Sequence, residues 1–213
     1  MYPTGNLSIP VTHGLLEAII KEPSTSPRGV ALVLHPHPLG GGTMHNKVVF
    51  RAASALNDAG LVTLRINFRG VGRSSGQHDE GRGELEDVRA ALAYLEANYH
   101  DQTITLCGFS FGARVGLEVG ISHNRVANLI SIGTPVDKYD FGFLEACRKP
   151  ILFVHGETDE FGSLVRLKAL VEKISENAPV TLIVIEGVGH FFEGKLDELK
   201  RAITKWTEQA ILR

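Results

Sequence analysis

The 213-residue chain has only two cysteines, two methionines and one tryptophan, and it contains no long apolar run. Two cysteines, Cys107 and Cys147, are too few for a disulfide framework, and Cys107 stands in an apolar stretch typical of a buried free thiol. No segment approaches the roughly 20 apolar residues that span a bilayer. The N-terminus, MYPTGNLSIPVTHG, also lacks the basic start and apolar stretch of a secretory signal. We therefore expect reduced cysteines and a cytoplasmic protein without a membrane span.

The chain also lacks an excess of charge of either sign. Its formal net charge is −2, and Lys and Arg are scattered rather than gathered into a basic stripe, which argues against a nucleic-acid partner. With 43% hydrophobic and 22% charged residues, the composition is that of an ordinary globular protein. We expect one domain over residues 1–213, with a core large enough for a sheet covered on both faces. The oligomeric state is left open, with a homodimer as one option.

Apolar runs alternate with segments of helical periodicity along most of the chain. After a short amphipathic region at 15–20, the run GVALVLHPHP from residue 29 predicts a buried strand. Further strands are expected at 61–68, 103–107, 128–132, 150–155 and 180–185. Helices are expected at about 46–59, 83–98, 111–121, 163–177 and from 194 onward. This alternation predicts an α/β fold with a doubly wound, mostly parallel sheet and helices on both faces.

The loops that follow the predicted strands hold the unusual residues. In order they read HPHPLGGG, RGVGRSSG, GFSFG, GTPVD, HGETDE and EGVGH. In doubly wound sheets, ligands bind at the carboxyl ends of the strands, so the chemistry is expected in these loops.

The segment GFSFG, residues 108–112, lies between a predicted strand and a predicted helix. It matches the G-x-S-x-G nucleophile elbow in the context that this motif requires. Glycines allow the turn to close, and the turn projects the Ser110 hydroxyl over the sheet. The amide of Phe111, at the start of the helix, can then face a developing oxyanion. Ser110 is the candidate nucleophile.

A serine nucleophile needs a base, and the base needs a third group to orient it. His190, in the glycine-rich loop after the last strand, is the best candidate among nine histidines. Asp159, four residues beyond the strand ending at His155, is the candidate acid, with Glu157, Glu160 and Asp137 as rivals. The chain order Ser, Asp, His is the order used by α/β-hydrolases.

Five of these motifs together resemble the α/β-hydrolase superfamily, and within it the small lidless bacterial esterases and dienelactone-hydrolase-like proteins. The resemblance covers about residue 28 to the C-terminus and rests on HPHPLGGG, NFRGVGRSSG, GFSFG, HGETD and GVGH. It implies a triad of Ser110, Asp159 and His190, with Phe111 as the first oxyanion amide.

The same resemblance places the second oxyanion donor in the loop after His35. Many family members have His-Gly there, but this chain has His35-Pro36, and proline carries no amide hydrogen. The backbone of His37 is therefore the first choice and that of Leu39 the second.

Dienelactone-cleaving members commonly carry cysteine at the elbow, so Ser110 disfavours that substrate. The short stretch between residues 132 and 150 leaves room for a small flap at most, and no large cap domain is expected. Tyr139, Phe141 and Phe143 are candidate walls of an acyl pocket, with ordinary core packing as the equal alternative.

The sequence gives only weak signals for metal or nucleotide binding. His35, His37 and His45 could suggest a metal site, but no carboxylate or further ligand is spaced to complete it. Neither RGVGRSSG nor GGGTMHNK has the spacing of a nucleotide-binding loop. No metal and no cofactor is expected.

We predict hydrolysis of carboxylic esters of short to medium acyl chain through an acyl-enzyme. A thioesterase, acyltransferase or peptidase with the same triad, or a non-catalytic binding protein of the same fold, remain the alternatives.

Overall fold

A single eight-stranded sheet organises the chain in the computed structural model, which describes residues 5–211. The strands are β1 (Gly5–Val11), β2 (Gly14–Lys21), β3 (Val30–Leu34), β4 (Val62–Ile66), β5 (Ile104–Phe109), β6 (Val126–Ile132), β7 (Ile151–Gly156) and β8 (Val180–Ile185). Their order across the sheet is β1-β2-β4-β3-β5-β6-β7-β8. β1 and β2 run antiparallel to their neighbours, and the pairs from β4 to β8 are parallel.

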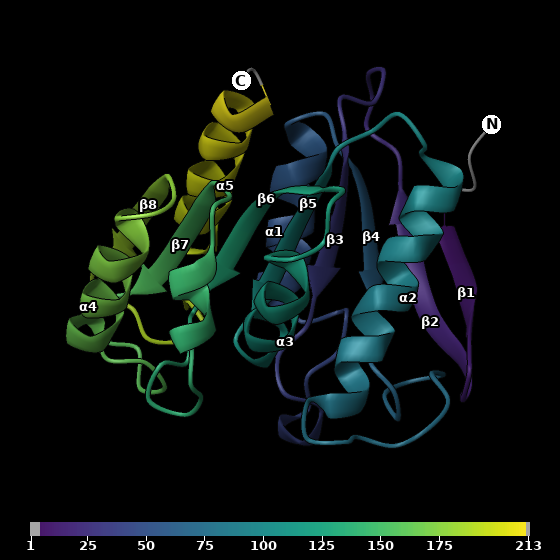
Figure 1. The fold of residues 1–213 in the computed structure, drawn as a ribbon, viewed down its shortest axis with the longest axis horizontal. Helices are drawn as coiled ribbons and strands as arrows, with labels where there is room; N and C mark the ends of the chain where they lie inside the picture. Colours follow the sequence, from purple (N-terminus) through teal and green to yellow (C-terminus); the bar gives the residue numbers. More distant parts are fainter. Residues whose placement is uncertain (1–4, 212–213) are drawn as a thin grey trace.

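Within the described residues 5–211, five α-helices cover the two faces of this sheet (Figure 1). They are α1 (Lys47–Asp58), α2 (Arg82–Asn98), α3 (Phe111–Gly120), α4 (Leu164–Ser175) and α5 (Leu196–Ile211). α2, α3 and α4 share one hydrophobic core with the sheet, whereas α1 and α5 share the core on the opposite face. The expected doubly wound, mostly parallel α/β sheet is therefore confirmed.

The central strands are apolar throughout because both of their faces are covered. Every residue of β3, β5 and β7 is buried, as is typical of parallel strands between two helical layers. The predicted strands and helices agree with the observed elements to within a few residues at their ends. Both cysteines are free and buried.

The edge of the sheet differs most from the expectation. The amphipathic region at 15–20 lies in β2, and β1, for which we predicted no element, pairs with it in a hairpin. In β2 the buried residues are Leu16, Ala18 and Ile20, which gives the period of two that a half-exposed strand requires.

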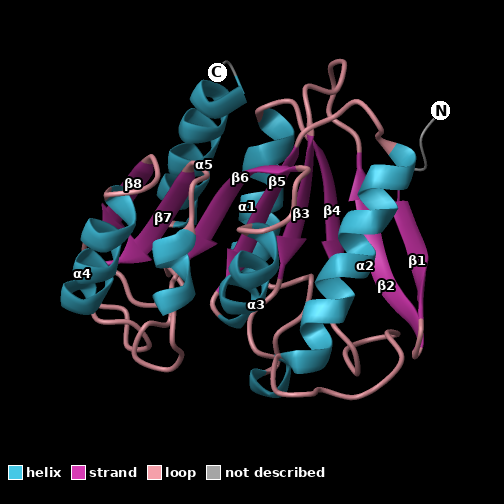
Figure 2. Cartoon of the chain, viewed as in Figure 1, coloured by secondary structure: helices cyan, strands magenta, loops and turns pink. Residues whose placement is uncertain are grey.

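The loops at the carboxyl ends of the parallel strands gather at one edge, toward which the arrowheads of β6 and β7 point in Figure 2. The connection between β6 and β7 contains turns and one short 3₁₀ helix, η2 (Gly142–Ala146), so no large cap formed by the described residues covers this edge. None of the described helices combines the length and the apolar character required to cross a membrane.

Candidate active site

Ser110 occupies a sharp turn between β5 and α3. Its backbone has φ 56° and ψ −119°, a conformation that residues with a side chain rarely adopt and that costs on the order of 1–3 kcal/mol. The Ser110 amide donates to the carbonyl of Ile132 at 2.9 Å and so ties the turn to β6. The strand-turn-helix arrangement expected for GFSFG is present.

Two glycines let this turn pack closely. A β-carbon at residue 108 would overlap the backbone of Gly112, and one at residue 112 would overlap the carbonyl oxygen of His35. Gly108 is thus required for contact between β5 and the first turn of α3, and Gly112 for contact between α3 and the end of β3. Substitution at either position would displace the serine.

His190 lies against the Ser110 hydroxyl group. Its Nε2 is 2.8 Å from Ser110 Oγ, and its Nδ1 is 2.8 Å from Asp159 Oδ2. Because a carboxylate only accepts hydrogen bonds, Nδ1 carries the proton and Nε2 is left to accept from the serine. The imidazole is 3% exposed and contacts the rings of Phe161 and Phe191. The three residues therefore form one continuous hydrogen-bonded chain.

Asp159 is held by groups other than His190. Its Oδ1 accepts from the amide of Phe161 at 2.9 Å. On its other side lies the buried ring of His155, whose Nδ1 is 3.8 Å from Asp159 Oδ2. His155 Nε2 donates to the carbonyl of Gly162 at 2.6 Å. His155 therefore braces the turn that carries the carboxylate, as expected of a structural histidine.

The three rival acids bind elsewhere. Glu157 accepts from the amide of Gly187, Glu160 accepts from the amide of His190, and Asp137 pairs with Arg166. None of these three carboxylates contacts the His190 ring. Glu160 instead fixes the backbone of the loop that carries this histidine.

His35 joins the end of β3 to the loop after β4. Its Nε2 accepts from the amide of Phe68 at 3.0 Å, so its Nδ1 carries the proton and donates to the carbonyl of Pro36 at 2.6 Å. The ring is fully buried, and this burial lowers its pKa from 6.5 to about 4. The neutral ring thus positions the backbone that begins the HPHP loop.

This depressed pKa predicts a pH-dependent stability. Between pH 6.5 and about pH 4, His35 binds a proton in the unfolded chain but not in the folded protein. The stabilising contribution of the neutral His35 ring is therefore complete above pH 6.5 and declines as pH falls. Between about pH 7.5 and pH 5 the loss from His35 amounts to about 2 kcal/mol. Urea unfolding at both pH values should show that His35→Gln removes this part of the pH dependence. An identical pH dependence in the variant would refute the assignment.

His37 lies in the loop after β3, and Phe111 is the first residue of α3, directly after Ser110. Within residues 5–211, neither of their backbone amides donates a hydrogen bond. The amide of Leu39, our second choice for the oxyanion, donates instead to His37 Nδ1 at 3.2 Å, and the Leu39 side chain is 78% exposed. The geometry therefore favours His37 over Leu39.

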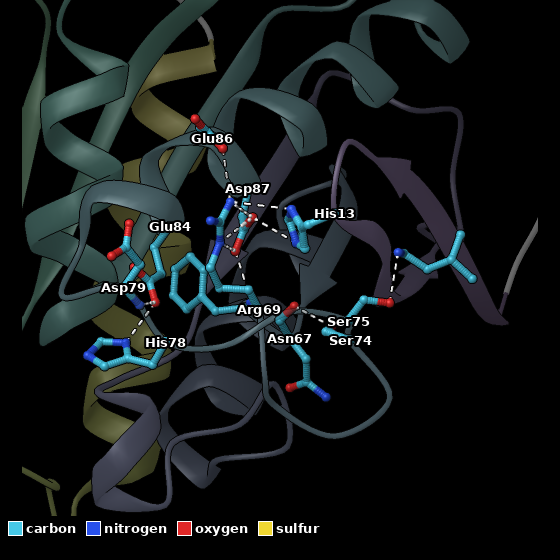
Figure 3. Close-up of polar contacts among 12 residues, drawn as sticks. His13, Asn67, Arg69, Ser74, Ser75, His78, Asp79, Glu84, Glu86 and Asp87 are labelled. Atoms are coloured by element: carbon cyan, nitrogen blue, oxygen red, sulfur yellow. Dashed lines mark hydrogen bonds and ion pairs between the residues drawn. The ribbon is translucent and has the colours of Figure 1, made fainter.

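The loop between β4 and α2 is anchored by a buried carboxylate. Asp87 accepts from the amide and the guanidinium of Arg69, and His13 of the β1–β2 hairpin lies 3.6 Å from the same carboxylate (Figure 3). This cluster ties the hairpin, the loop and α2 together.

His78, on the same loop, lies next to both candidate oxyanion residues. Its Nδ1 is 2.7 Å from a carboxylate oxygen of the fully buried Glu84 (Figure 3). Its ring is 4.8 Å from that of His37 and 5.6 Å from that of Phe111. The His78 side chain is largely buried, with 11% of its surface exposed. The sequence signal for this contact is Glu84, which stands six residues after His78, at the third position of α2.

A cavity of about 500 Å³ opens beside Ser110 and His190. The other residues that line it are Pro36, His37, Gly40, Gly41, Gly42, Asn46, Pro135, Lys138, Tyr139, Phe161 and Phe191. Phe161 and Phe191 were not among our candidates, although both flank predicted triad residues in the sequence.

Of the three aromatic residues expected in an acyl pocket, only Tyr139 lines this cavity. Phe141 is 3% exposed and stacks on Phe143, with ring centroids 5.9 Å apart. Both contribute to the core beneath η2, because the chain turns inward after Tyr139. Across residues 5–211, no group of three His, Cys, Asp or Glu side chains is arranged to hold a metal ion.

Comparison with known proteins agrees with this architecture. A family model described as alpha/beta hydrolase fold matches residues 31–147, more than half of the chain. The chain is 40% identical over 191 residues to the uncharacterized protein RP471 of Rickettsia prowazekii, covering 86% of this chain and 80% of that protein.

Two solved structures are similar over nearly the whole chain. An alpha-beta serine hydrolase homologue from Coxiella burnetii is 40% identical, with a TM-score of 0.89, and the match covers 96% of this chain and 99% of that one. XC6422 from Xanthomonas campestris, a serine hydrolase without a lid, is 33% identical, with a TM-score of 0.90 and coverage of 98% and 96%. The chain belongs to the α/β-hydrolase fold family.

Proposed function

We propose that this protein is a serine hydrolase that cleaves carboxylic esters of short to medium acyl chain. The observation that carries the proposal is the unbroken chain of hydrogen bonds from Ser110 through His190 to Asp159, at the wall of an open cavity. Ser110 is the nucleophile, His190 the general base and acid, and Asp159 the group that orients the imidazole.

The reaction has two steps. Ser110 Oγ attacks the ester carbonyl carbon while His190 Nε2 takes the hydroxyl proton. The bond to the alcohol oxygen then breaks, and His190 returns the proton to the leaving alcohol. Water attacks the acyl-enzyme, with His190 again accepting a proton, and the acid leaves as Ser110 regains its hydrogen. The net reaction consumes one ester and one water and yields one acid and one alcohol.

The oxyanion of each tetrahedral intermediate is held by the amides of Phe111 and His37. Both amides lack a hydrogen-bond partner among the described residues, which leaves them able to donate to a bound substrate. The Phe111 amide is also at the N-terminus of α3, where the helix dipole favours negative charge.

The cavity supports a preference for compact esters. Its volume of about 500 Å³ lies in the range of small-molecule sites, and Phe161, Phe191 and Tyr139 supply apolar surface beside the serine. We infer that the enzyme acts in the cytoplasm, because both cysteines are free and buried.

The experiment that tests the proposal combines turnover with covalent labelling. We expect the protein to hydrolyse 4-nitrophenyl esters from acetate to octanoate, with the highest kcat/KM at a short or medium chain. A fluorophosphonate should label the native protein once, on the peptide that contains Ser110, and should not label heat-unfolded protein. A folded protein that neither turns over nor labels would leave a non-catalytic binding role.

A further inference from the structure

The wall of the Ser110 cavity carries one fixed positive charge. Among the Asp, Glu, Lys and Arg residues that the structure describes, only Lys138 lines this cavity. Its ammonium lies 5.7 Å from the centroid of the Phe161 ring, and that ring lies 4.6 Å from the ring of His190. The charge is therefore one aromatic ring away from the imidazole of the proposed triad.

Lys138 stands on a short turn with defined geometry. The amides of Lys138 and Tyr139 both donate to the carbonyl of Pro135, at 3.0 and 3.1 Å. Pro135, Lys138 and Tyr139 all line the cavity. The turn therefore holds Lys138 at the cavity wall, and the residue is exposed to solvent.

Nearby carboxylates do not neutralise this lysine. Asp137 pairs with Arg166 at 2.9 Å and accepts from the amide of Ser163, and Asp140 accepts from the amide of Gly142. Within residues 5–211, Lys138 forms no ion pair. Its ammonium is therefore available to pair with a charged ligand.

Two other polar side chains on the wall also offer donors. Asn46 Oδ1 accepts from the amide of Val48 at 2.9 Å, which leaves its NH₂ group as a donor. His37 Nδ1 accepts from the amide of Leu39, so the neutral ring carries its proton on Nε2. Burial and the neighbouring His78 lower the pKa of His37, which keeps the ring neutral. The described residues of the wall therefore offer several donors and include no carboxylate.

We propose that the preferred ester substrates of this enzyme carry a carboxylate, which pairs with Lys138 while Ser110 attacks the ester carbonyl. This inference rests on the proposed serine hydrolase function and narrows its substrate class to half-esters of dicarboxylic acids and esters of hydroxy or phenolic acids. An ammonium over an aromatic ring at a partly enclosed wall attracts a carboxylate. No Asp or Glu among the described lining residues competes with the ligand for it.

The test compares matched anionic and neutral esters. One pair carries the charge on the acyl side: the mono-4-nitrophenyl ester of adipic acid and the same compound as its methyl ester. The other pair carries it on the alcohol side: 4-acetoxybenzoate and methyl 4-acetoxybenzoate. We expect the native enzyme to prefer the anion in at least one pair, and Lys138→Met to lower that kcat/KM ratio about tenfold, which corresponds to about 1.4 kcal/mol.

Two further variants separate charge from packing. Lys138→Arg should retain the preference, and Lys168→Met, which removes an exposed lysine of α4 that does not line the cavity, should leave both ratios unchanged. The preference should also weaken as ionic strength rises, because the pair is partly exposed. If the ratios of Lys138→Met equal those of the native enzyme in both pairs, the inference is wrong.

A binding measurement distinguishes this failure from failure of the proposed function. Calorimetry with Ser110→Ala should show tighter binding of monomethyl adipate than of dimethyl adipate, and Lys138→Met in the same background should abolish the difference. Turnover of the neutral esters together with equal binding of the two adipates would overturn only the carboxylate preference. Absence of turnover and of fluorophosphonate labelling would overturn the hydrolase itself.

Discussion

Ser110→Ala is expected to lower kcat/KM for 4-nitrophenyl esters by at least about 10⁴-fold and to abolish fluorophosphonate labelling. The substitution removes the Oγ that lies 2.8 Å from His190 Nε2, so neither the attack nor the acyl-enzyme remains. Activity left in the variant would reflect the oxyanion amides and substrate binding alone. The measurement is initial-rate kinetics at several ester concentrations, with labelling followed by intact-protein mass spectrometry.

The control for this variant is a serine outside the site. Ser122→Ala changes an exposed hydroxyl that donates to the carbonyl of Val119 at the end of α3, and it should retain full activity and labelling. Ser110→Ala should still unfold in one cooperative transition at a urea concentration close to that of the native protein, because the change removes one hydroxyl and leaves the backbone contacts of the turn in place. Retention of esterase activity in Ser110→Ala would exclude the serine mechanism.

Asp159→Asn should reduce kcat by about 10⁴-fold while the fold is preserved. The carboxylate accepts the proton of His190 Nδ1, and an amide NH₂ in its place would favour the tautomer with the proton on Nε2. That tautomer cannot accept the hydroxyl proton of Ser110. Because the ester still binds in the cavity, KM should change much less than kcat.

Asp137→Asn is the matched control, because it makes the same chemical change in the rival acid that pairs with Arg166. It should keep kcat within about twofold of the native value. If instead Asp159→Asn keeps most of its activity and Glu160→Gln loses it, Glu160 is the acid, since its carboxylate holds the His190 amide at 3.1 Å. Kinetics of the three variants with one ester is sufficient to decide.

Most of the sheet could be predicted because its signals are local. Buried parallel strands such as β3 and β7 are continuous apolar runs, and the helices between them show an apolar period near 3.6. The β1–β2 hairpin is harder to predict because β1 is the edge strand, with only Ile9 buried, and because β2 buries only alternate residues. The alternation of Leu16, Ala18 and Ile20 is present in the sequence, but over so few residues it indicates only an amphipathic segment.

The candidate triad could be predicted for a similar reason. Each member follows a strand of the parallel sheet, and the carboxyl ends of such strands meet at one edge. The choice of Asp159 over Glu157 and Glu160 depended on which way each side chain turns within a single loop. The structure brings Asp159 to the imidazole and leaves Glu157 and Glu160 bound to backbone amides. The catalytic role of the three triad residues stays a prediction.

The cavity walls could not be predicted in this way. Tyr139, Phe141 and Phe143 look equivalent in the sequence, yet the turn at Pro135 directs Tyr139 to the cavity, and η2 directs the other two into the core. Phe161 and Phe191 line the cavity because the loops after β7 and β8 fold over the serine. Contacts between distant loops decide these positions, and no short window of sequence contains them.

The sequence by itself determined the α/β class, the alternation of strands and helices from residue 29 onward, and the residues GFSFG, HGETD and GVGH that carry the candidate triad. Backbone propensity and apolar periodicity act over a few residues, so these features can be predicted from the sequence without a structure. Only the tertiary structure decided that His35 is a neutral structural histidine, that His78 pairs with buried Glu84, and that, within residues 5–211, Lys138 has no acidic partner at the cavity. Burial and charge pairing arise between segments far apart in the chain, and folding alone brings those segments together.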